Sequence, residues 1–220
     1  MKIFVVLSLF ICFASIQAYG QKQTAKPNPE IAKMVKEVSA KNIEATIRKL
    51  VTFGTRNTLS EQDNPTRGVG AARDWLYGEF IKISKACGNC LDVQKEAFVQ
   101  PKAPRVAEPT TLTNVFAILN GTTDSKRYYV VSGHYDSMCN LDATDAKCDA
   151  PGANDDASGT AASLELARVM SKRKFDATIV FMTVPGEEQG LLGATYYAEQ
   201  AKIKCRCPQR DCRRDFENSA

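Results

Sequence analysis

Apolar residues recur every three or four positions in four parts of the chain, which is the spacing of amphipathic helices. The segments are residues 30–53, 68–87, 158–171 and 191–200. We expect the first to form two consecutive helices and Gly88 to end the second. In the third, Glu165 and Arg168 fall between the apolar positions, so we expect both side chains to turn outward.

Strand-like patterns occupy the stretch between the second and third helices and return after the third. Residues 91–99 alternate apolar and polar side chains, which predicts a half-buried strand. Three continuous apolar runs predict interior strands buried on both faces. These runs are residues 114–119, 128–132 and 177–184. A predicted helix separates the last two runs, and this order of strand, helix, strand predicts a parallel pair in an α/β fold.

Acidic residues and the one histidine of the sequence gather where predicted strands end or a predicted helix begins. They are His134 and Asp136 after one strand, Asp155 and Asp156 before a helix, and Glu187 and Glu188 after another strand. Because open α/β sheets build their sites at the carboxyl ends of strands, we expect these side chains to converge. Histidine and carboxylates are ligands for a divalent cation. The pattern therefore predicts a metal site that cleaves a bond with water.

The first two motifs suggest how such a site is organised. Asp136 lies two positions after His134, so its carboxylate is able to accept the imidazole N–H and raise the basicity of the ring toward a metal. Asp155 is interpreted as a carboxylate that bridges two metal ions, with Asp156 or Ser158 capping the following helix. The alternative for the aspartate pair is helix capping alone.

Glu187 and Glu188 form the third motif, which lies between glycines directly after a strand. One glutamate is able to bind metal while the other acts as general base, taking a proton from water and returning it to the leaving amine. The alternative is a solvated acidic turn. Each motif alone is weak evidence, and their joint order favours hydrolysis.

This joint order, H-x-D, then D-D before a helix, then E-E after a strand, resembles the secreted zinc exopeptidases of peptidase-M family twenty-eight. Bacterial leucyl aminopeptidases and glutamate carboxypeptidases typify that family. The resemblance extends from about Val51 to Gln200, and residues 53–60 and 67–76 are similar to early segments of the family. It implies a three-layer sandwich, in which a mixed, mostly parallel central sheet carries helices on both faces, with two zinc ions and a peptide substrate.

The resemblance also implies a role for each candidate residue. His134 is a ligand of one metal, Asp155 bridges both, Glu188 is a ligand of the other, Glu187 is the general base and Asp136 supports His134. A cis peptide bond is implied between Asp155 and Asp156. Asn57 stands where many relatives have histidine, and we interpret it as peripheral.

Two ligands of the family have no counterpart here: an aspartate after a further strand and a distal histidine. Each metal would then keep two protein ligands where catalytic zinc normally has three, so impaired activity is one expectation. We expect residues 30–200 to be a partial domain, incomplete at its C-terminus. Residues 201–220 are basic, lack helical or strand periodicity and are interpreted as an atypical tail with an aberrant ending. The alternative is that Cys205, Cys207 and Cys212 bind metal themselves.

The first 20 residues carry Lys2, an apolar run and a small-residue site, which is the pattern of a secretory signal cleaved before Gln21. A flexible polar leader, residues 21–29, follows. We therefore expect a secreted or periplasmic protein without stable membrane association; an uncleaved anchor is the alternative. In an oxidising compartment Cys139 and Cys148 are candidates for a disulfide. Cys87 and Cys90 are also candidates for a disulfide; the alternatives for this pair are a redox pair or half a zinc knuckle.

The formal net charge of +4 comes mainly from the tail, because residues 21–200 hold 22 basic and 22 acidic side chains. The basic tail residues are not interleaved with stacking aromatics, so no nucleic-acid partner is expected. The leading hypothesis is a zinc-dependent aminopeptidase; a glutamate carboxypeptidase or glutaminyl cyclase would use the same first ligands. The hypothesis from another class is a non-catalytic exported module that retains the fold. The oligomeric state is left open.

Overall fold

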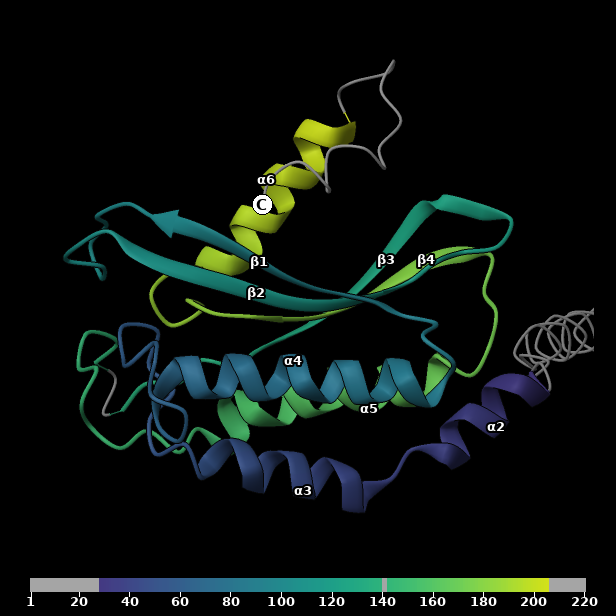
Figure 1. Ribbon diagram of the computed structural model, residues 1–220, viewed down its shortest axis with the longest axis horizontal. Helices are drawn as coiled ribbons and strands as arrows, with labels where there is room; N and C mark the ends of the chain where they lie inside the picture. The colour runs from purple at the N-terminus through teal and green to yellow at the C-terminus, as the bar shows by residue number, and fades with distance from the viewer. Residues whose placement is uncertain (1–27, 140–141, 206–220) are drawn as a thin grey trace, which may run out of the picture. The chain divides into compact units, whose positions relative to one another are not determined.

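The computed structural model describes residues 28–139 and 142–205 (Figure 1). The chain divides into two compact units, Met1–Lys36 and Glu37–Ala220. Helix α2, Pro29–Glu37, makes up nearly all that is described of the first unit. The predicted signal peptide, most of the leader and most of the tail lie outside the described residues, so these boundaries stay predictions.

One four-stranded sheet forms the centre of the second unit. Its strands are β1 (Asp92–Gln100), β2 (Thr110–Leu119), β3 (Asp124–His134) and β4 (Ala177–Val184), in the order β1-β2-β4-β3. β2 pairs with β1 and β4 in antiparallel fashion, whereas β3 and β4 are parallel. Helix α5 (Ser158–Met170) lies between them in the sequence, so the predicted strand, helix, strand unit is confirmed.

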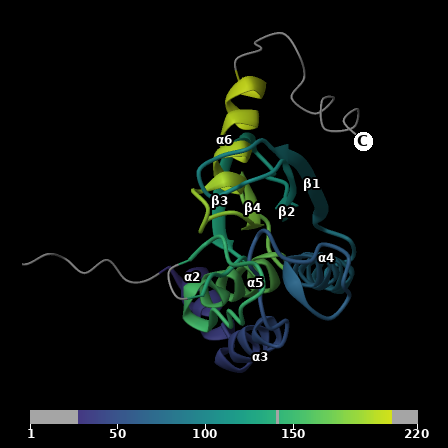
Figure 2. The same ribbon diagram turned by 90° about the vertical axis from the view of Figure 1, so that its left-hand side faces the viewer.

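Helices cover both faces of this sheet, which confirms the three-layer α/β architecture with a mixed sheet (Figure 1). α4 (Gly68–Ala86) and α5 pack on one face, and α3 (Ala40–Val51) lies outside them against α5 (Figure 2). α6 (Leu192–Cys205) lies on the other face and continues past Gln200, where helical periodicity was not expected to extend. Within the described part of the chain, no helix combines the length and apolar character needed to cross a membrane.

The core follows from the side-chain alternation of the central strands. Val115 and Ala117 of β2, with Phe181 of β4, face the layer of α4 and α5, where Leu76 and Phe80 are also fully buried. The intervening residues of the same strands, Phe116, Val180 and Met182, face α6. All eight residues of β4 are buried, as predicted for an interior strand.

The prediction that residues 128–132 are buried on both faces is wrong. β3 is an edge strand of the described sheet, paired with β4 alone. Tyr128, Tyr129 and Val130 are 55%, 56% and 49% exposed. An apolar run predicts a strand, but burial on both faces also needs neighbouring layers over both faces, and the sequence pattern does not report these.

The outward orientation predicted for Glu165 is also wrong, because α3 covers that side of α5. Glu165 is only 5% exposed. Its carboxylate accepts hydrogen bonds from the backbone N–H of Ser39, at 2.6 Å, and from the guanidinium of Arg168, at 2.6 and 2.8 Å. Glu165 therefore joins the start of α3 to α5.

Candidate metal centre

The parallel pairing of β3 and β4 brings two of the three predicted motifs to one edge of the sheet. His134 is in register with Val184 at the carboxyl ends of the two strands. The pairing continues one residue further, because the backbone N–H of Tyr135 donates to the carbonyl of Val184 at 2.9 Å. The H-x-D motif and the E-E motif both follow this register directly. They therefore meet because parallel strands end at the same edge.

The third motif reaches the same edge through the start of α5. Asp155 and Asp156 lie in the irregular turn η1 (Ala153–Ala157), and the peptide bond between them is cis, as the resemblance implied. Asp156 accepts the backbone N–H of Gly159 at 2.8 Å, which caps α5, and the backbone N–H of His134 at 3.0 Å. Asp156 thus fastens the helix start to the end of β3 and leaves Asp155 to face the imidazole.

The structure gathers the three predicted metal ligands into one cluster. One ligand atom from each of His134, Asp155 and Glu188 lies within 4.8 Å of the other two. Nε2 of His134 is 3.0 Å from Oδ1 of Asp155 and 3.8 Å from Oε2 of Glu187. The side chain of Asp155 is 74% exposed, whereas Glu188 is buried. The cluster is therefore open to solvent on the Asp155 side.

Asp136 lies behind His134, as predicted, and is completely buried. Its Oδ1 is 3.3 Å from Nδ1 of the imidazole. The carboxylate also accepts the backbone N–H groups of Glu187 and Glu188, both at 3.3 Å, and the hydroxyl of Thr58 at 3.0 Å. One carboxylate therefore orients the ring of His134 and holds the backbone of the E-E motif.

The charges of the cluster shift two pKa values. Burial lowers the pKa of His134, but the hydrogen bond and charge of Asp136, with the charges of Asp156 and Glu187, outweigh it and raise the pKa to about 9. Burial, reinforced by the charges of Asp136 and Asp155, raises the pKa of Glu188 to about 7. In both residues the neighbouring carboxylates favour the protonated form, so part of each shift reflects an excess of negative charge at one point. A divalent cation at that point would offset it, and the imidazole and carboxylate donors suit zinc.

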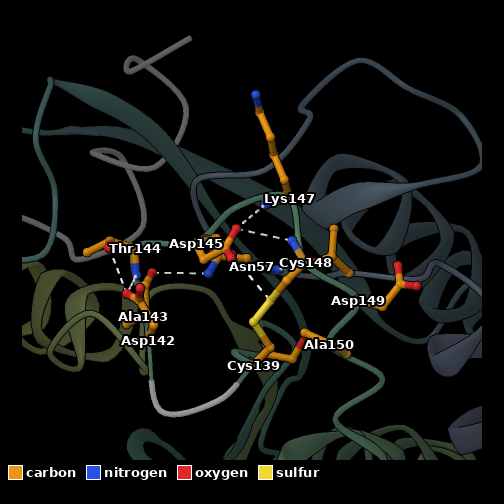
Figure 3. Close-up of a disulfide and its surroundings, with 12 residues drawn as sticks. Asn57, Cys139, Asp142, Ala143, Thr144, Asp145, Lys147, Cys148, Asp149 and Ala150 are labelled. Carbon is orange, nitrogen blue, oxygen red and sulfur yellow. Dashed lines mark hydrogen bonds between the residues drawn. A yellow bond between two sulfur atoms is a disulfide. The ribbon is translucent and has the colours of Figure 1, made fainter.

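A second group of possible ligands, Cys139, Asp145 and Cys148, does not form a comparable site. The two cysteines form a disulfide, as predicted, so their sulfurs are not thiolate ligands (Figure 3). Asn57 is fully buried beside this loop and donates to the carbonyl of Ala143 at 3.0 Å. Asn57 is therefore an internal anchor of the disulfide loop rather than a surface residue. Cys87 and Cys90 also form a disulfide.

The sequence reasoning missed Thr58 and Arg56, which are both completely buried behind the cluster. The hydroxyl of Thr58 donates to Asp136 and accepts the backbone N–H of Gly186 at 2.9 Å. The guanidinium of Arg56 donates to backbone carbonyls near His134 and before Asp155. Two signals in the sequence point to this stretch: the polar run T-R-N-T between Gly54 and Leu59, and the resemblance of residues 53–60 to an early segment of the family.

The fold and this cluster define an α/β protein with a group of possible metal ligands at one edge of its sheet. Residues 114–209 match the model of peptidase family M28. Probable zinc metalloproteases of the fungi Leptosphaeria maculans and Pyrenophora teres f. teres are each 49% identical over 176 residues, which is 80% of this chain. The matched segment therefore has the sequence pattern of peptidase family M28. It spans 41% and 36% of the length of those two relatives.

Solved structures with low sequence identity share the fold. LapB from Legionella pneumophila is 19% identical with a TM-score of 0.60, over 81% of this chain and 43% of that one. An aminopeptidase from Aneurinibacillus sp. strain AM-1 is 20% identical with a TM-score of 0.54, over 76% and 67% of the two chains. A glutaminyl cyclase from Fimbriiglobus ruber is 17% identical with a TM-score of 0.59, over 82% and 58%. One architecture thus occurs in proteins whose names indicate different reactions.

Proposed function

We propose that this chain is part of a secreted, zinc-dependent exopeptidase of the aminopeptidase type, with Glu187 as its general base. The observation that carries the proposal is the convergence of the ligand atoms of His134, Asp155 and Glu188 within 4.8 Å, beside Glu187. The zinc metalloprotease names of the fungal relatives support the choice of metal and of peptide bonds as substrate.

His134, Asp155 and Glu188 are the residues that would hold zinc, with Asp155 as the bridge if two ions bind. When bound, zinc supplies Lewis-acid polarisation of the peptide carbonyl and acidifies water. The burial of Glu188 and the exposure of Asp155 support entry of the substrate from the Asp155 side, because that side faces solvent.

The protein's own contribution to catalysis is orientation and proton transfer. Nδ1 of His134 lies 3.3 Å from both the carboxylate and the backbone carbonyl of Asp136, so Asp136 is able to accept the Nδ1–H and direct Nε2 toward the cluster. Glu187, whose side chain is 37% exposed, is available to take a proton from the attacking water and to return it to the leaving amine. Because the carboxylate of Asp136 also accepts the backbone N–H of Glu187, it helps to fix the positions of both the proposed base, Glu187, and the proposed ligand, His134.

Export is proposed from the N-terminal sequence pattern and is supported by the two disulfides, since disulfides persist in oxidising compartments. The partner we propose is a peptide with a free amino terminus. Neither a nucleic-acid partner nor stable membrane association after signal cleavage is part of the proposal.

The test is hydrolysis of a leucyl anilide by the purified chain, with and without added zinc, in the wild type and in Glu187→Gln. Loss of a general base should lower kcat by about 10²–10⁴-fold while zinc content stays unchanged. Glu44→Gln, at an exposed position on α3 where the carboxylate pairs with Arg48, is the matched control and should keep wild-type activity. Absence of both zinc-dependent hydrolysis and stoichiometric zinc in the wild type would instead support the non-catalytic module.

A further inference from the structure

Arg56 is a buried cation whose side-chain hydrogen bonds all run to backbone carbonyls. Its residue is 0% exposed. Nε donates to the carbonyl of Tyr135 at 2.7 Å, Nη2 donates to Gly152 at 2.9 Å, and Nη1 donates to Pro151 at 2.8 Å and to Leu50 at 3.3 Å. Four of the five guanidinium N–H groups are therefore used. In the described part of the chain, Arg56 takes part in no ion pair with a carboxylate.

Three of these carbonyls belong to the two segments that present metal ligands. Tyr135 lies between His134 and Asp136 at the end of β3. Pro151 and Gly152 open the turn that leads to Asp155. The rigid fork of one guanidinium thus joins the two segments at fixed spacing, which a flexible point charge such as lysine cannot reproduce.

The backbone of Arg56 makes a second connection between the same segments through Ser137. The N–H of Arg56 donates to the hydroxyl of Ser137 at 3.1 Å, and the N–H of Ser137 donates to the carbonyl of Arg56 at 3.2 Å. The hydroxyl of Ser137 in turn donates to the carbonyl of Ala150 at 2.8 Å. The end of β3, the stretch around Arg56 and the turn before Asp155 are therefore locked together twice.

The atoms around this connection are closely packed. A Cβ added to Gly152, whose φ is +43°, would lie 2.8 Å from Nη2 of Arg56 and 2.6 Å from the carbonyl oxygen of Asp155. The guanidinium also carries its charge beneath the anionic cluster. Burial lowers its pKa to about 10, against the charges of Asp136 and Asp156, so Arg56 remains a cation at neutral pH.

From this geometry we infer that Arg56 is a positioning residue for the metal centre: it sets the distance between His134 and Asp155 through two connections, the bonds of its guanidinium to the carbonyls of residues 135, 151 and 152 and the bonds of its backbone to Ser137. It touches neither substrate nor metal. The inference rests on the proposed function in one respect, since it assumes that the cluster binds a cation.

Arg56→Lys tests this role because it keeps the positive charge and removes the planar fork. Zinc affinity of the full chain, without a histidine tag, is measured by competition with a chromophoric chelator. Because His134 is the only histidine in the sequence, its imidazole NMR signal reports whether it still binds zinc. Loss of an outer support of a metal site typically weakens metal binding by about 10–100-fold, and we expect a loss in this range.

Arg173→Lys is the matched control. Arg173 is also largely buried and donates to the carbonyl of Val169 at 2.7 Å, but it lies at the opposite end of α5 from η1. It should keep wild-type zinc affinity. If the circular dichroism spectrum shows that Arg56→Lys does not fold, Ser137→Ala is the second test. This variant removes the hydroxyl that bonds the backbone of Arg56 and Ala150 and leaves the guanidinium bonds intact. A folded Ser137→Ala protein should bind zinc several-fold more weakly.

The outcomes separate this inference from the proposed function. Wild-type zinc affinity in folded Arg56→Lys, or in folded Ser137→Ala if the lysine variant does not fold, overturns the positioning role. A wild-type chain that binds zinc but hydrolyses no peptide overturns the proposed function. The ratio of zinc affinities between Arg56→Lys and the wild type still tests the positioning role of Arg56 in that case. A wild-type chain that binds no zinc overturns both.

Discussion

Asp136→Asn is the substitution that most directly tests the electrostatics of the cluster. Asp136 is completely buried and lies 3.3 Å from Nδ1 of His134. Asparagine has nearly the same shape, but it carries no charge and one oxygen in place of two. The change therefore removes the charge that favours the imidazolium and keeps the shape of the side chain, although its amide group replaces one of the two oxygens that accept hydrogen bonds from the backbone of the E-E motif.

The expected effect is a fall in the pKa of His134 in metal-free protein. Burial lowers this pKa, and Asp136 is the main group that raises it to about 9 from the ordinary 6.5. Without the carboxylate, burial should bring the pKa back toward 6.5. The difference between 6.5 and about 9 corresponds to about 3 kcal/mol.

The sign of the pH dependence follows from linkage. A histidine whose pKa is raised in the folded state stabilises that state fully below pH 6.5, and this stabilisation is lost as pH rises through about 9. Wild-type metal-free protein should therefore lose up to about 3 kcal/mol of unfolding free energy over this range from His134 alone. Asp136→Asn should lack most of that dependence.

The assay is an NMR titration of the single imidazole, combined with urea unfolding at about pH 6 and pH 9. Asp124→Asn is the control, because Asp124 lies at the opposite end of β3 and pairs with Arg127 at the surface. It should leave the titration of His134 unchanged. An imidazole in folded Asp136→Asn that titrates at the wild-type pH would refute the reasoning.

Three further predictions concern the supports of the fold and the site. Thr58→Val keeps the shape of a buried residue but removes the hydroxyl that bonds Asp136, so urea unfolding should show a loss of about 1–3 kcal/mol. Gly133→Ala would place a Cβ against the backbone at the start of α5, and more than about 4 kcal/mol should be lost. Its control is Gly78→Ala, where a Cβ meets nothing within 4 Å, so α4 should instead gain about 0.5–1 kcal/mol of stability. Glu165→Gln should lower the thermal midpoint at neutral pH and less so in acid, because hydrogen bonds, against burial, lower the pKa of Glu165.

Each of these has a contrary result that would count against it. Equal stability of the Thr58→Val protein and the wild type would mean that water replaces the lost hydroxyl. Soluble, fully stable Gly133→Ala protein would show that β3 and α5 do not approach as closely as described. In the wild type, the stabilisation linked to the lowered pKa of Glu165 is lost as pH falls. A difference in thermal midpoint between the wild type and Glu165→Gln that grows in acid would therefore contradict the prediction.

The sequence was sufficient to predict that the candidate ligands converge, because their positions depend on strand ends. An apolar strand followed by H-x-D, and another followed by E-E, predict convergence once the strands are parallel. Burial was harder to predict. The apolar run at Tyr128 resembles an interior strand but is exposed, and Glu165 lies on the polar side of its helix but is buried. In both cases the burial depends on whether a neighbouring layer covers the residue. Pattern within one segment contains no information about which segment covers it.

The supports of the site were beyond the reach of periodicity. Thr58 and Arg56 lie in a stretch without helical or strand pattern, and their partners are far away in the chain. Thr58 bonds Asp136 across 78 residues, and Arg56 bonds Gly152 across 96. A polar run that is fully buried is the kind of exception that only three-dimensional packing reveals.

The separation of the ligands along the chain has a thermodynamic consequence. His134 and Asp155 are 21 residues apart, and Glu188 comes from a third segment, so an unfolded chain has no preformed cage for a cation. A cation that binds only the native form raises the melting temperature in proportion to the logarithm of its concentration. At a hundredfold excess over Kd the gain is about 2.7 kcal/mol, and a chelator should withdraw it. Resistance to heat is thus adjustable from outside the molecule by the supply of metal.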